Sequence, residues 1–469
     1  MNNQSQGLAS KRIEQLLDEN SFVEIGAGMK SRSTDFNMNA CETPGDGVVT
    51  GYGVINGSLV YVYSQDPAVL GGAIGEMHAK KIINLYDLAI KMGAPVIGLI
   101  DCAGLRLQES VDAMDAFGKI YAKQSQASGV IPQITAVFGN CGGGVSLFTN
   151  LSDFAFMEEK KANLFVNSPN ALDGNYKEKL NTASAEYQGS VAGNVDFVCS
   201  EDDIYAGIRD LLSYLPANNQ DGVEEIDNGD DVNRFVEAYY DMKEPVDFIK
   251  DVADNNAFVE VKKNFAKSMI CGFARIGGNS VGIVANRENV LTVEGCDKAS
   301  DFINECDAFG IPVVTISKVK GFEATVESEK KIARAAAKLT YAYASADVAK
   351  ITLLVGDNYG SASVVMGSKS IGADLVFAWN DSKLSLIDSK SAVKIMYSDE
   401  LANKTDALGF IDEKAKEYDA NVAGINSAVS RGQVDSVIEV ERTRQYLVNA
   451  IDMLATKRVT VEFKKHGTV

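Results

Sequence analysis

Three consecutive glycines, at positions 142–144, follow the apolar run ITAVF and precede a segment of helical composition. Glycine has no Cβ, so a ligand can approach its backbone closely, and the first N–H groups of a helix have no partner within that helix. Such a turn can bind an anion: a phosphate, a carboxylate, or the oxyanion of a thioester enolate or tetrahedral species. The spacing matches neither G-x-x-x-x-G-K-[ST] nor G-x-G-x-x-G, and a purely structural strand-to-helix turn is the alternative.

Histidines and paired cysteines, which often carry acid–base or metal chemistry, are scarce in this sequence. It contains only two histidines, His78 and His466, so a histidine base or a histidine-rich metal site is not expected. A Ser-His-Asp triad would have to use His78, and no G-x-S-x-G motif accompanies it. The seven cysteines include no C-x-x-C pair, which indicates buried small residues rather than a zinc site. We therefore expect no metal ion.

Composition and charge limit the class of protein. The 469 residues are 46% hydrophobic and 23% charged, which is typical of a globular chain with two or three domains. The formal net charge of −19 disfavours nucleic acid and anionic lipid as partners and leaves small molecules and proteins. No apolar run approaches the roughly 20 residues of a membrane span, and the first residues lack an apolar signal core. We therefore expect a cytoplasmic protein.

The sequence contains an internal repeat, which decides how the glycine turn is interpreted. Gly93 and Gly310 are 217 positions apart, as are Gly139 and Gly356. The matching stretches are GYGVINGSLVYVYSQ with GFARIGGNSVGIVAN, KMGAPVIGLIDCAG with AFGIPVVTISKVKG, and ITAVFGNCGGG with ITLLVGDNYGS. The two halves are predicted to be copies of one unit.

Each copy has the pattern of an α/β unit. The runs PVIGLI, ITAVF, PVVTIS and ITLLV fit strands buried on both faces, separated by helical stretches. The second copy carries its own turn, GDNYGSASVVM, at the place equivalent to the first. A polar stretch at 215–234 separates the copies, so we predict domains at 1–226 and 227–469.

Several motifs together resemble those of the biotin-dependent acyl-CoA carboxyltransferase family, the group of propionyl-CoA carboxylase β subunits and methylmalonyl-CoA decarboxylase α subunits. The resemblance runs from about Gly51 to Tyr397, in the order and spacing of the family. It rests on SQDPAVLGGAIGEMHAKKI, GAPVIGLIDCAGLRLQE, GNCGGGVSLFTNLSDFAFM, GFARIGGNSVGIVANR, FINECDAFGIPVV, NYGSASVVMGSK and FAWNDSKLSL. It implies a tandem duplication of two crotonase-like (ClpP/crotonase) α/β domains, acyl-CoA on the first and biotin on the second.

The implied reaction accounts for the lack of a histidine base. In the family, carboxybiotin releases CO2, the biotin anion removes the α-proton of an acyl-CoA, and the enolate captures the CO2. The protein then needs two backbone oxyanion holes. Carried over by position, Gly143 and Gly144 would serve the thioester, and Ser361 and Ala362 the ureido oxygen of biotin. The resemblance further assigns cofactor binding to Gly71, Gly72, Ala73, Gly104, Gly321, Phe322, Gly360 and Val364, the last at a position that helps to set acyl length.

The sequence departs from the family in the second half. Where members commonly have Pro-Gly-Phe-x-Pro-Gly, this chain reads KVKGFEATVESEKK, which retains only Gly321 and Phe322. That segment lies near the biotin entry in the family, so the altered stretch at 318–331 leaves biotin binding open. Lys80 or Lys81 could reach the CoA phosphates, with a solvated helix face as the alternative.

The resemblance also implies partners. The chain has no A-M-K-M biotinylation sequence and no recognisable ATP-binding domain. It would therefore need a biotinyl carrier protein and either a biotin carboxylase subunit or a membrane decarboxylase subunit. We expect a homo-oligomer, either a dimer or a trimer of dimers, in which the two turns meet across a subunit boundary.

Alternatives remain at this point. A biotin-free crotonase-type hydratase or isomerase would need a carboxylate at the α-carbon, for which Glu109 and Glu323 are the candidates. A non-catalytic scaffold subunit is the other alternative. The acyl group (propionyl/methylmalonyl or acetyl/malonyl) and the direction, carboxylation or decarboxylation, stay open.

Overall fold

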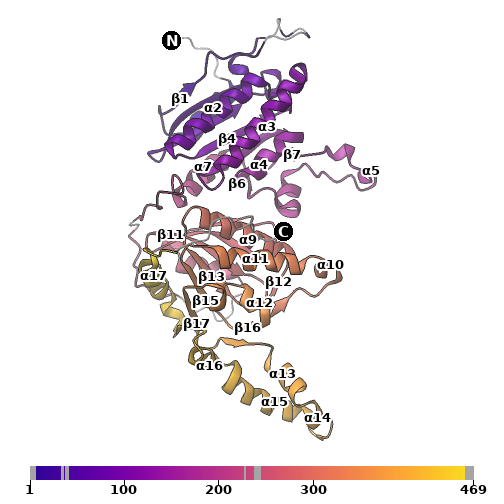
Figure 1. The fold of residues 1–469 in the computed structure, drawn as a ribbon, viewed down its shortest axis with the longest axis vertical. Coiled ribbons are helices and arrows are strands. Elements are labelled where there is room, and N and C mark those ends of the chain that lie inside the picture. The colour runs from indigo at the N-terminus through magenta and orange to yellow at the C-terminus, as the bar shows by residue number, and fades with distance from the viewer. Residues whose placement is uncertain are drawn as a thin grey trace. The chain divides into compact units, whose positions relative to one another are not determined.

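The computed structural model describes residues 7–32, 36, 38, 42–226, 229–236 and 244–459 (Figure 1). The chain forms two units, which divide between Gly222 and Val223. The sequence placed the boundary between 226 and 227, with an acyl-CoA side before it and a biotin side after it. That assignment of roles remains a prediction.

The first unit is built on one mixed sheet. Its strands follow the order β1-β2-β3-β4-β5-β6-β8, and β7 pairs with the end of β5. The pairs β1–β2 and β2–β3 are antiparallel, and all later pairs are parallel. The strands are β1 (Val23–Ile25), β2 (Val48–Ile55), β3 (Ser58–Gln65), β4 (Val96–Cys102), β5 (Gln133–Gly142), β6 (Phe154–Glu158), β7 (Asn163–Phe165) and β8 (Phe197–Cys199).

Helices follow most of these strands, as expected for parallel crossovers. The central strand β4 is buried throughout, because helices α2 and α3 pack against each other and share its core. The helix α2 ends at Gly93, whose left-handed φ of 60° closes the last turn. The helical segments are α1 (Leu8–Leu16), η2 (Gly45–Gly47), η3 (Leu70–Gly72), α2 (Glu76–Met92), η4 (Leu107–Glu109), α3 (Ser110–Ala127), η5 (Gly143–Ser146), α4 (Leu147–Leu151), η6 (Pro169–Ala171), α5 (Asn175–Glu178), α6 (Ala185–Tyr187), η7 (Gln188–Ala192) and α7 (Glu201–Tyr214).

The second unit repeats this plan. Its main sheet has the order β19-β17-β15-β13-β11-β10-β9, antiparallel at β9–β10–β11 and parallel from β11 onward. Two small parallel pairs, β12–β14 and β16–β18, lie outside it. The strands are β9 (Phe258–Val261), β10 (Met269–Ile276), β11 (Asn279–Asn286), β12 (Val290–Leu291), β13 (Val313–Ser317), β14 (Gly321–Phe322), β15 (Lys350–Leu354), β16 (Asp357–Tyr359), β17 (Leu375–Trp379), β18 (Lys383–Ser385) and β19 (Ser436–Ile438).

The helices of the second unit include a pair that corresponds to α2 and α3. Helices α9 and α11 pack against each other in the same way. The helical segments are α8 (Pro245–Val252), η8 (Asp254–Asn256), α9 (Val293–Ala308), α10 (Val326–Glu329), α11 (Ile332–Ser345), α12 (Gly360–Val365), η9 (Lys369–Ile371), α13 (Ser389–Met396), α14 (Ser398–Leu401), α15 (Ala407–Tyr418), η10 (Asp419–Ala423), α16 (Ile425–Ser430), η11 (Val440–Arg442) and α17 (Thr443–Leu454).

The predicted repeat is confirmed, and two details recur at the 217-residue offset. The bridge between Ile74 and Leu105 has its counterpart in Leu291 and Phe322, each 217 positions later. A buried lysine recurs at the same offset. Lys81 on α2 donates to the carbonyls of Gly45 and Val48, and Lys298 on α9 donates to three carbonyls within 262–269. In both units this ammonium group holds the segment that precedes or begins the first hairpin strand.

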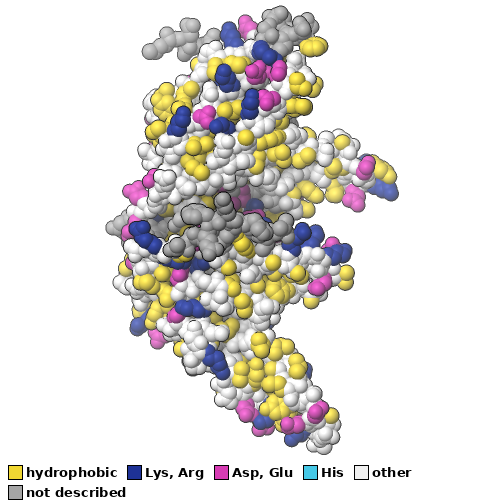
Figure 2. Space-filling model, in the orientation of Figure 1, with side chains coloured by type: hydrophobic (Ala, Val, Ile, Leu, Met, Phe, Trp, Pro, Cys, Tyr) yellow, Lys and Arg dark blue, Asp and Glu magenta, His cyan; other side chains and the backbone are white. Residues whose placement is uncertain are grey.

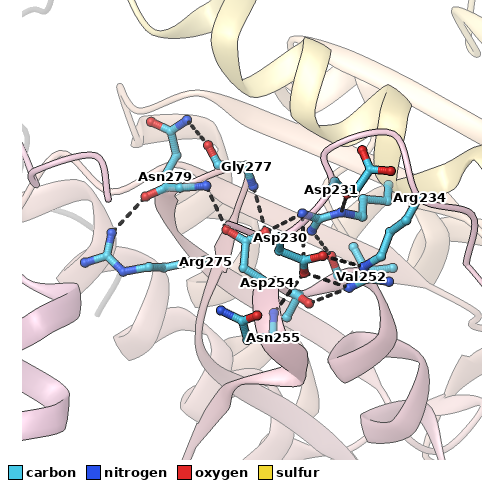
Figure 3. A network of polar contacts seen from close by, with 12 residues as sticks. Asp230, Asp231, Arg234, Val252, Asp254, Asn255, Arg275, Gly277 and Asn279 are labelled. Carbon is cyan, nitrogen blue, oxygen red and sulfur yellow. Dashed lines mark hydrogen bonds and ion pairs between the residues drawn. The ribbon is translucent and has the colours of Figure 1, made fainter. Parts of the chain in front are cut away.

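The polar stretch at 215–234 is divided between the two units. Its early residues bind the first unit: Asn218 donates to the carbonyl of Gly93 at 2.9 Å. Its later residues belong to the second unit, where Asp230, Arg234 and Asp254 lie in one polar network (Figure 3). The buried Arg444 of α17 joins this network through a 2.6 Å ion pair with Asp254. The described residues of this stretch are therefore anchored to one unit or the other.

The remaining sequence expectations concern cysteines and membrane spans. The six cysteines within the described ranges are free thiols, and five of them are buried, as predicted. Cys41 and His466 lie outside the described residues. Among the helices that the structure describes, none has both the length and the hydropathy of a membrane span.

Candidate functional site

The first glycine turn begins where β5 leaves the sheet. The short strand β7 pairs with residues 140–142 of β5 and carries the strand to the start of the turn. Gly143 then adopts a φ of 62°, a left-handed value that favours glycine, and η5 begins. The preceding residue, Gly142, offers no side-chain cap. The N-cap residue therefore leaves the first N–H groups of this turn uncapped, as an anion site requires.

The two central glycines have different surroundings. A Cβ built on Gly143 would meet no atom within 4 Å in the chain. A Cβ on Gly144 would lie 2.6 Å from Phe117 Cε2 and 2.7 Å from Tyr121 Oη, both on α3. Gly144 therefore has to be glycine so that the turn can pack on α3, whereas Gly143 is required for its backbone conformation.

The loop at 70–74 lies beside the segment that contains Gly104. Ala103 donates to the carbonyl of Gly71, and Ile74 donates to that of Gly104, both at 2.9 Å. Gly71 and Gly72 have φ values of 66° and 65°. A side chain on Gly72 would collide with the carbonyl oxygen of Asp101. The structure thus brings together Gly71, Gly72, Ala73 and Gly104, and their contact with CoA stays a prediction.

A buried ion cluster holds this loop in place. Arg106, which is 1% exposed, donates to the carbonyl of Ala73 at 2.8 Å. Its other nitrogen contacts Asp46 at 2.6 Å and Glu109 at 2.9 Å. Burial raises the pKa of Asp46, and the adjacent guanidinium opposes that rise. Glu109 also accepts the N–H of Glu76 at 2.6 Å. Its carboxylate is therefore committed to the fold and is not free to act as a base.

Two other candidates from the sequence are excluded by their environment. Lys81 is 3% exposed, and its ammonium group donates to backbone carbonyls. It therefore neither contacts a CoA phosphate nor lies on a solvated helix face. Lys80 is exposed and stays a candidate. His78 is fully buried between Asp46 and Gln65, and burial lowers its pKa to about 3. A neutral, inaccessible imidazole cannot take part in a catalytic triad.

The second turn has the same backbone form as the first. Strand β16 pairs with β18 and leads into α12, and Gly360 has a φ of 63° where Gly143 has 62°. Ser361 has a negative φ and an exposed side chain, and Ala362 is buried. Tyr359, before the turn, provides no side-chain cap. Serine is therefore accommodated here, as the backbone interpretation of this turn requires.

This turn opens into a cavity of about 800 Å³ within the second unit. One wall is Gly360, Ser361 and Val364, and Val364 is 41% exposed. The remainder combines apolar and hydroxyl groups from the segments after β17 and around α16. These include Leu384, Leu386, Tyr418, Val422, Ser427 and Arg431.

The altered segment at 318–331 borders this turn. Val319 accepts the N–H of Tyr359 at 2.8 Å, and Lys320 pairs with Asp357 at 3.0 Å. Gly321 and Phe322 form β14, which pairs with β12. Phe322 and Glu323 are both partly exposed. The segment therefore packs beside the second turn although it lacks the two prolines that are common in the family.

Sequence reasoning missed the groups that support these turns. Arg106 and Ser146 lie within motifs that it used but received no role, and Tyr121 lies outside them, because each acts through a contact distant in sequence or through a backbone carbonyl. The cavity walls at 384–386 and 418–433 are also new. The 217-residue offset would have found the Lys81–Lys298 pair, since both are lysines at equivalent positions.

Comparison with known proteins places the chain in a family. Residues 2–469 match the carboxyl transferase domain. The chain is 39% identical to the methylmalonyl-CoA decarboxylase subunit alpha of Propionigenium modestum, covering 98% of this chain and 92% of that protein. It is 40% identical to a putative propionyl-CoA carboxylase beta chain of Bacillus subtilis (strain 168), with 98% and 93% covered.

A solved structure supports the same assignment. The transcarboxylase 12S structure, described as a hexamer assembly with methylmalonyl-coenzyme A and methylmalonic acid bound, matches with a TM-score of 0.94 at 36% identity. The match covers 98% of this chain and 91% of that one. The prediction of two crotonase-like α/β domains is confirmed. Because its two turns are equivalent, its fold is duplicated and these relatives match it over almost its whole length, the chain belongs to the family of biotin-dependent acyl-CoA carboxyltransferases.

Proposed function

We propose that this chain is the carboxyltransferase subunit that moves a carboxyl group between biotin on a carrier protein and a short-chain acyl-CoA. The observation that carries this proposal is the pair of equivalent turns, with φ values of 62° at Gly143 and 63° at Gly360. Each turn follows a strand at the same end of its unit and presents helix-start N–H groups. Two preformed oxyanion sites suit a reaction in which negative charge develops on two oxygens.

The first turn is proposed to bind the thioester. The N–H groups of Gly143 and Gly144 donate to the thioester oxygen as it gains negative charge in the enolate. A donor of this kind contributes roughly 2.7–4 kcal/mol in comparable sites. The loop of Gly71, Gly72 and Ala73, with Gly104 beside it, is proposed to bind CoA, because glycine allows close approach of the ligand.

The second turn is proposed to bind biotin. The cavity beside Gly360 fits such a group, since apolar walls such as Leu384 accompany the helix-start N–H groups of Ser361 and Ala362. Gly321 and Phe322 lie on the segment that borders this turn. Biotin, when bound, supplies the carboxyl group and the base. The chain itself orients the ureido oxygen, stabilises its charge and limits access of water.

The acyl group is proposed to be short. Val364 lines the cavity proposed for biotin, and the α-carbon of the acyl group must come close to biotin for transfer. Its side chain would then present an apolar surface to the acyl group, which accepts a methyl or ethyl group and offers no charge to it. The relatives named above act on methylmalonyl-CoA or propionyl-CoA. We propose the propionyl/methylmalonyl pair first and the acetyl/malonyl pair second.

The proposed partners are a biotinyl carrier protein and a biotin carboxylase or membrane decarboxylase subunit, with the cytoplasm as location. A homo-oligomer is proposed as well, because the second unit exposes large hydrophobic side chains (Figure 2). Leu386, Ile395 and Leu408 are 85%, 68% and 77% exposed. The transcarboxylase relative is described as a hexamer. Association of chains would cover these side chains and place the first turn of one chain opposite the second turn of another.

The test is a carboxyl-transfer assay with the full-length protein. The protein is incubated with a biotinylated carrier protein and methylmalonyl-CoA or malonyl-CoA labelled in the free carboxyl group. Transfer of label to the carrier is the expected result, and omission of biotinylation is the control. Formation of a hydrated or isomerised thioester without biotin would replace the proposal with the crotonase-type alternative. Absence of any reaction in a reconstituted complex would favour a scaffold subunit.

A further inference from the structure

Two side-chain hydroxyls hold the backbone of the first turn. Ser146 Oγ donates to the carbonyl oxygen of Gly143 at 2.6 Å, and Tyr121 Oη donates to that of Gly144 at 2.7 Å. Ser146 lies in η5 itself and is 4% exposed, whereas Tyr121 comes from α3. The two bonds reach the turn from different elements, so both carbonyls on either side of the Gly144 Cα are held.

These carbonyls control the direction of the neighbouring N–H groups. A peptide group is planar, so the oxygen of Gly143 and the N–H of Gly144 move as one body. The oxygen of Gly144 and the N–H of Val145 are linked in the same way. A peptide between glycines rotates readily, because no Cβ restricts φ and ψ. A hydrogen bond to the oxygen opposes that rotation and also polarises the N–H on the other side of the plane.

The tyrosine is itself held in one position. Its ring packs against Phe117 and Phe148, with ring centroids 5.7 Å and 5.8 Å away. The missing Cβ of Gly144 allows Tyr121 Oη to come this close, since a Cβ would lie 2.7 Å from that oxygen. A donor on a ring fixed by packing gives a constant position to the peptide it binds.

The second turn lacks this support. The position 217 residues after Tyr121 is Lys338, which pairs with Asp301 at 2.8 Å. Within the described part of the chain, no side-chain donor reaches the carbonyl of Gly360 or Ser361. The position 217 residues after Ser146 is Ser363, so the serine recurs in the second unit. The tyrosine contact is therefore the part of this support that is specific to the turn of the first unit.

We propose that Tyr121 and Ser146 are positioning residues for carboxyl transfer. Ser146 holds the Gly143 carbonyl and so aims the N–H of Gly144 at the oxyanion of the substrate enolate, and Tyr121 holds the peptide on the other side of Gly144 and so fixes the backbone of that residue. The inference rests on the proposed function of the first turn. Neither side chain needs to touch the substrate. They act on the enolate rather than on the neutral acyl-CoA, because a well-aimed N–H binds the negatively charged oxygen more strongly than the neutral carbonyl oxygen.

The test uses the variants Tyr121→Phe and Ser146→Ala in the assembled enzyme. Each removes one hydroxyl and leaves the packing nearly unchanged. We expect each variant to lower kcat about three- to tenfold, with KM for the acyl-CoA unchanged, from the usual strength of one hydrogen bond. The double variant should lose less than the product of the two effects, because the two bonds hold adjacent peptide planes that meet at the Gly144 Cα.

Two matched variants control for the loss of a hydroxyl. Ser213 Oγ donates to the carbonyl three residues earlier at 2.6 Å, as Ser146 does, and Tyr205 Oη donates to Glu201 at 3.1 Å. Both lie on α7, which contributes no residue to either turn. Ser213→Ala and Tyr205→Phe should leave kcat unchanged.

A binding measurement without turnover gives an independent readout. A CoA analogue that carries a nitronate in place of the enolate mimics the charged oxygen, and a CoA thioether without a carbonyl is its neutral counterpart. Titration calorimetry should show that Tyr121→Phe and Ser146→Ala weaken nitronate binding by the same factor as kcat and leave thioether binding unchanged.

The outcomes separate this inference from the proposed function. Wild-type affinity for the nitronate in both variants would overturn the positioning role, and so would an equal loss for the nitronate and the thioether. If the wild-type protein transfers no carboxyl group, the proposed function fails. Selective loss of nitronate affinity would still support the role of the two hydroxyls in that case.

Discussion

The backbone role of the second turn can be tested with one residue, Ser361. It is the second residue of α12, its side chain is exposed, and its φ is negative. Proline at this position deletes the N–H that we assign to the ureido oxygen of biotin. In the first turn of a helix that N–H has no intrahelical partner, so proline breaks no bond of the helix.

The magnitude follows from the loss of one donor. Removing a single oxyanion donor costs about 2.7–4 kcal/mol, so Ser361→Pro should lower kcat for biotin-dependent transfer by roughly 100- to 1000-fold. Ser361→Gly and Ser361→Ala keep the N–H and should change kcat by no more than about twofold, since the difference is one exposed hydroxyl. The hydroxyl has no essential role in this account.

The assay measures transfer of label from methylmalonyl-CoA to the biotinylated carrier, together with binding of the acyl-CoA. Proline can also distort the chain, because it restricts Gly360, the residue before it. Asp202→Pro is a matched control, since Asp202 is likewise the second residue of a helix, α7, and is exposed. Acyl-CoA binding should survive in Ser361→Pro if the first unit alone binds the thioester.

Two results would refute the reasoning. Loss of activity by orders of magnitude in Ser361→Ala, with the structure preserved, would mean that the side chain acts chemically. Full activity of Ser361→Pro would mean that this N–H is not a donor in the reaction. Loss of acyl-CoA binding together with transfer would contradict the division of the two ligands between the two turns.

Three further predictions concern the first unit. Burial lowers the pKa of His78 to about 3 in the folded protein, against about 6.5 in the unfolded chain. The neutral histidine therefore stabilises the fold fully above pH 6.5, and this stabilisation is lost as the pH falls toward 3. In urea denaturation, the unfolding free energy of His78→Asn should fall by about 2 kcal/mol less between pH 7 and pH 5 than that of the wild type. Arg106→Met leaves two buried carboxylates unpaired and should cost about 3–5 kcal/mol in the same measurement, with weaker CoA binding. Gly144→Ala forces a Cβ against Phe117 and should cost about 1–3 kcal/mol and reduce kcat, whereas unchanged stability would contradict this packing.

The fold was predictable because its signals are local and repeated. Buried runs such as PVIGLI and ITLLV indicated parallel strands, and the 217-residue offset indicated two copies of one unit. The strand order of the two sheets contains both features. The glycine turns were also visible, since Gly143 and Gly360 need left-handed backbone that other residues rarely adopt.

The support of the site was not predictable in the same way. Lys81 sits on an amphipathic helix, where its charge suggested a surface or phosphate role, yet its ammonium binds carbonyls that lie 33 to 36 positions earlier. Glu109 suggested a base until its contact with Arg106 was known. Contacts between side chains and distant backbone groups leave no periodic signal in the sequence. The choice between catalytic and structural roles for charged residues therefore required coordinates.

The anchoring of the second unit by α17 has a consequence for the order in which the protein folds during synthesis. All strands of the first unit precede Gly222, so its sheet can close while the rest is being translated. The second unit needs Arg444 to balance the buried Asp254, and that arginine emerges 190 residues after Asp254, on the order of 10 to 40 s at usual elongation rates. During that interval the sheet edge at 254–279 carries an unbalanced carboxylate. Chaperones would therefore be expected to act on the second half of the nascent chain rather than on the first.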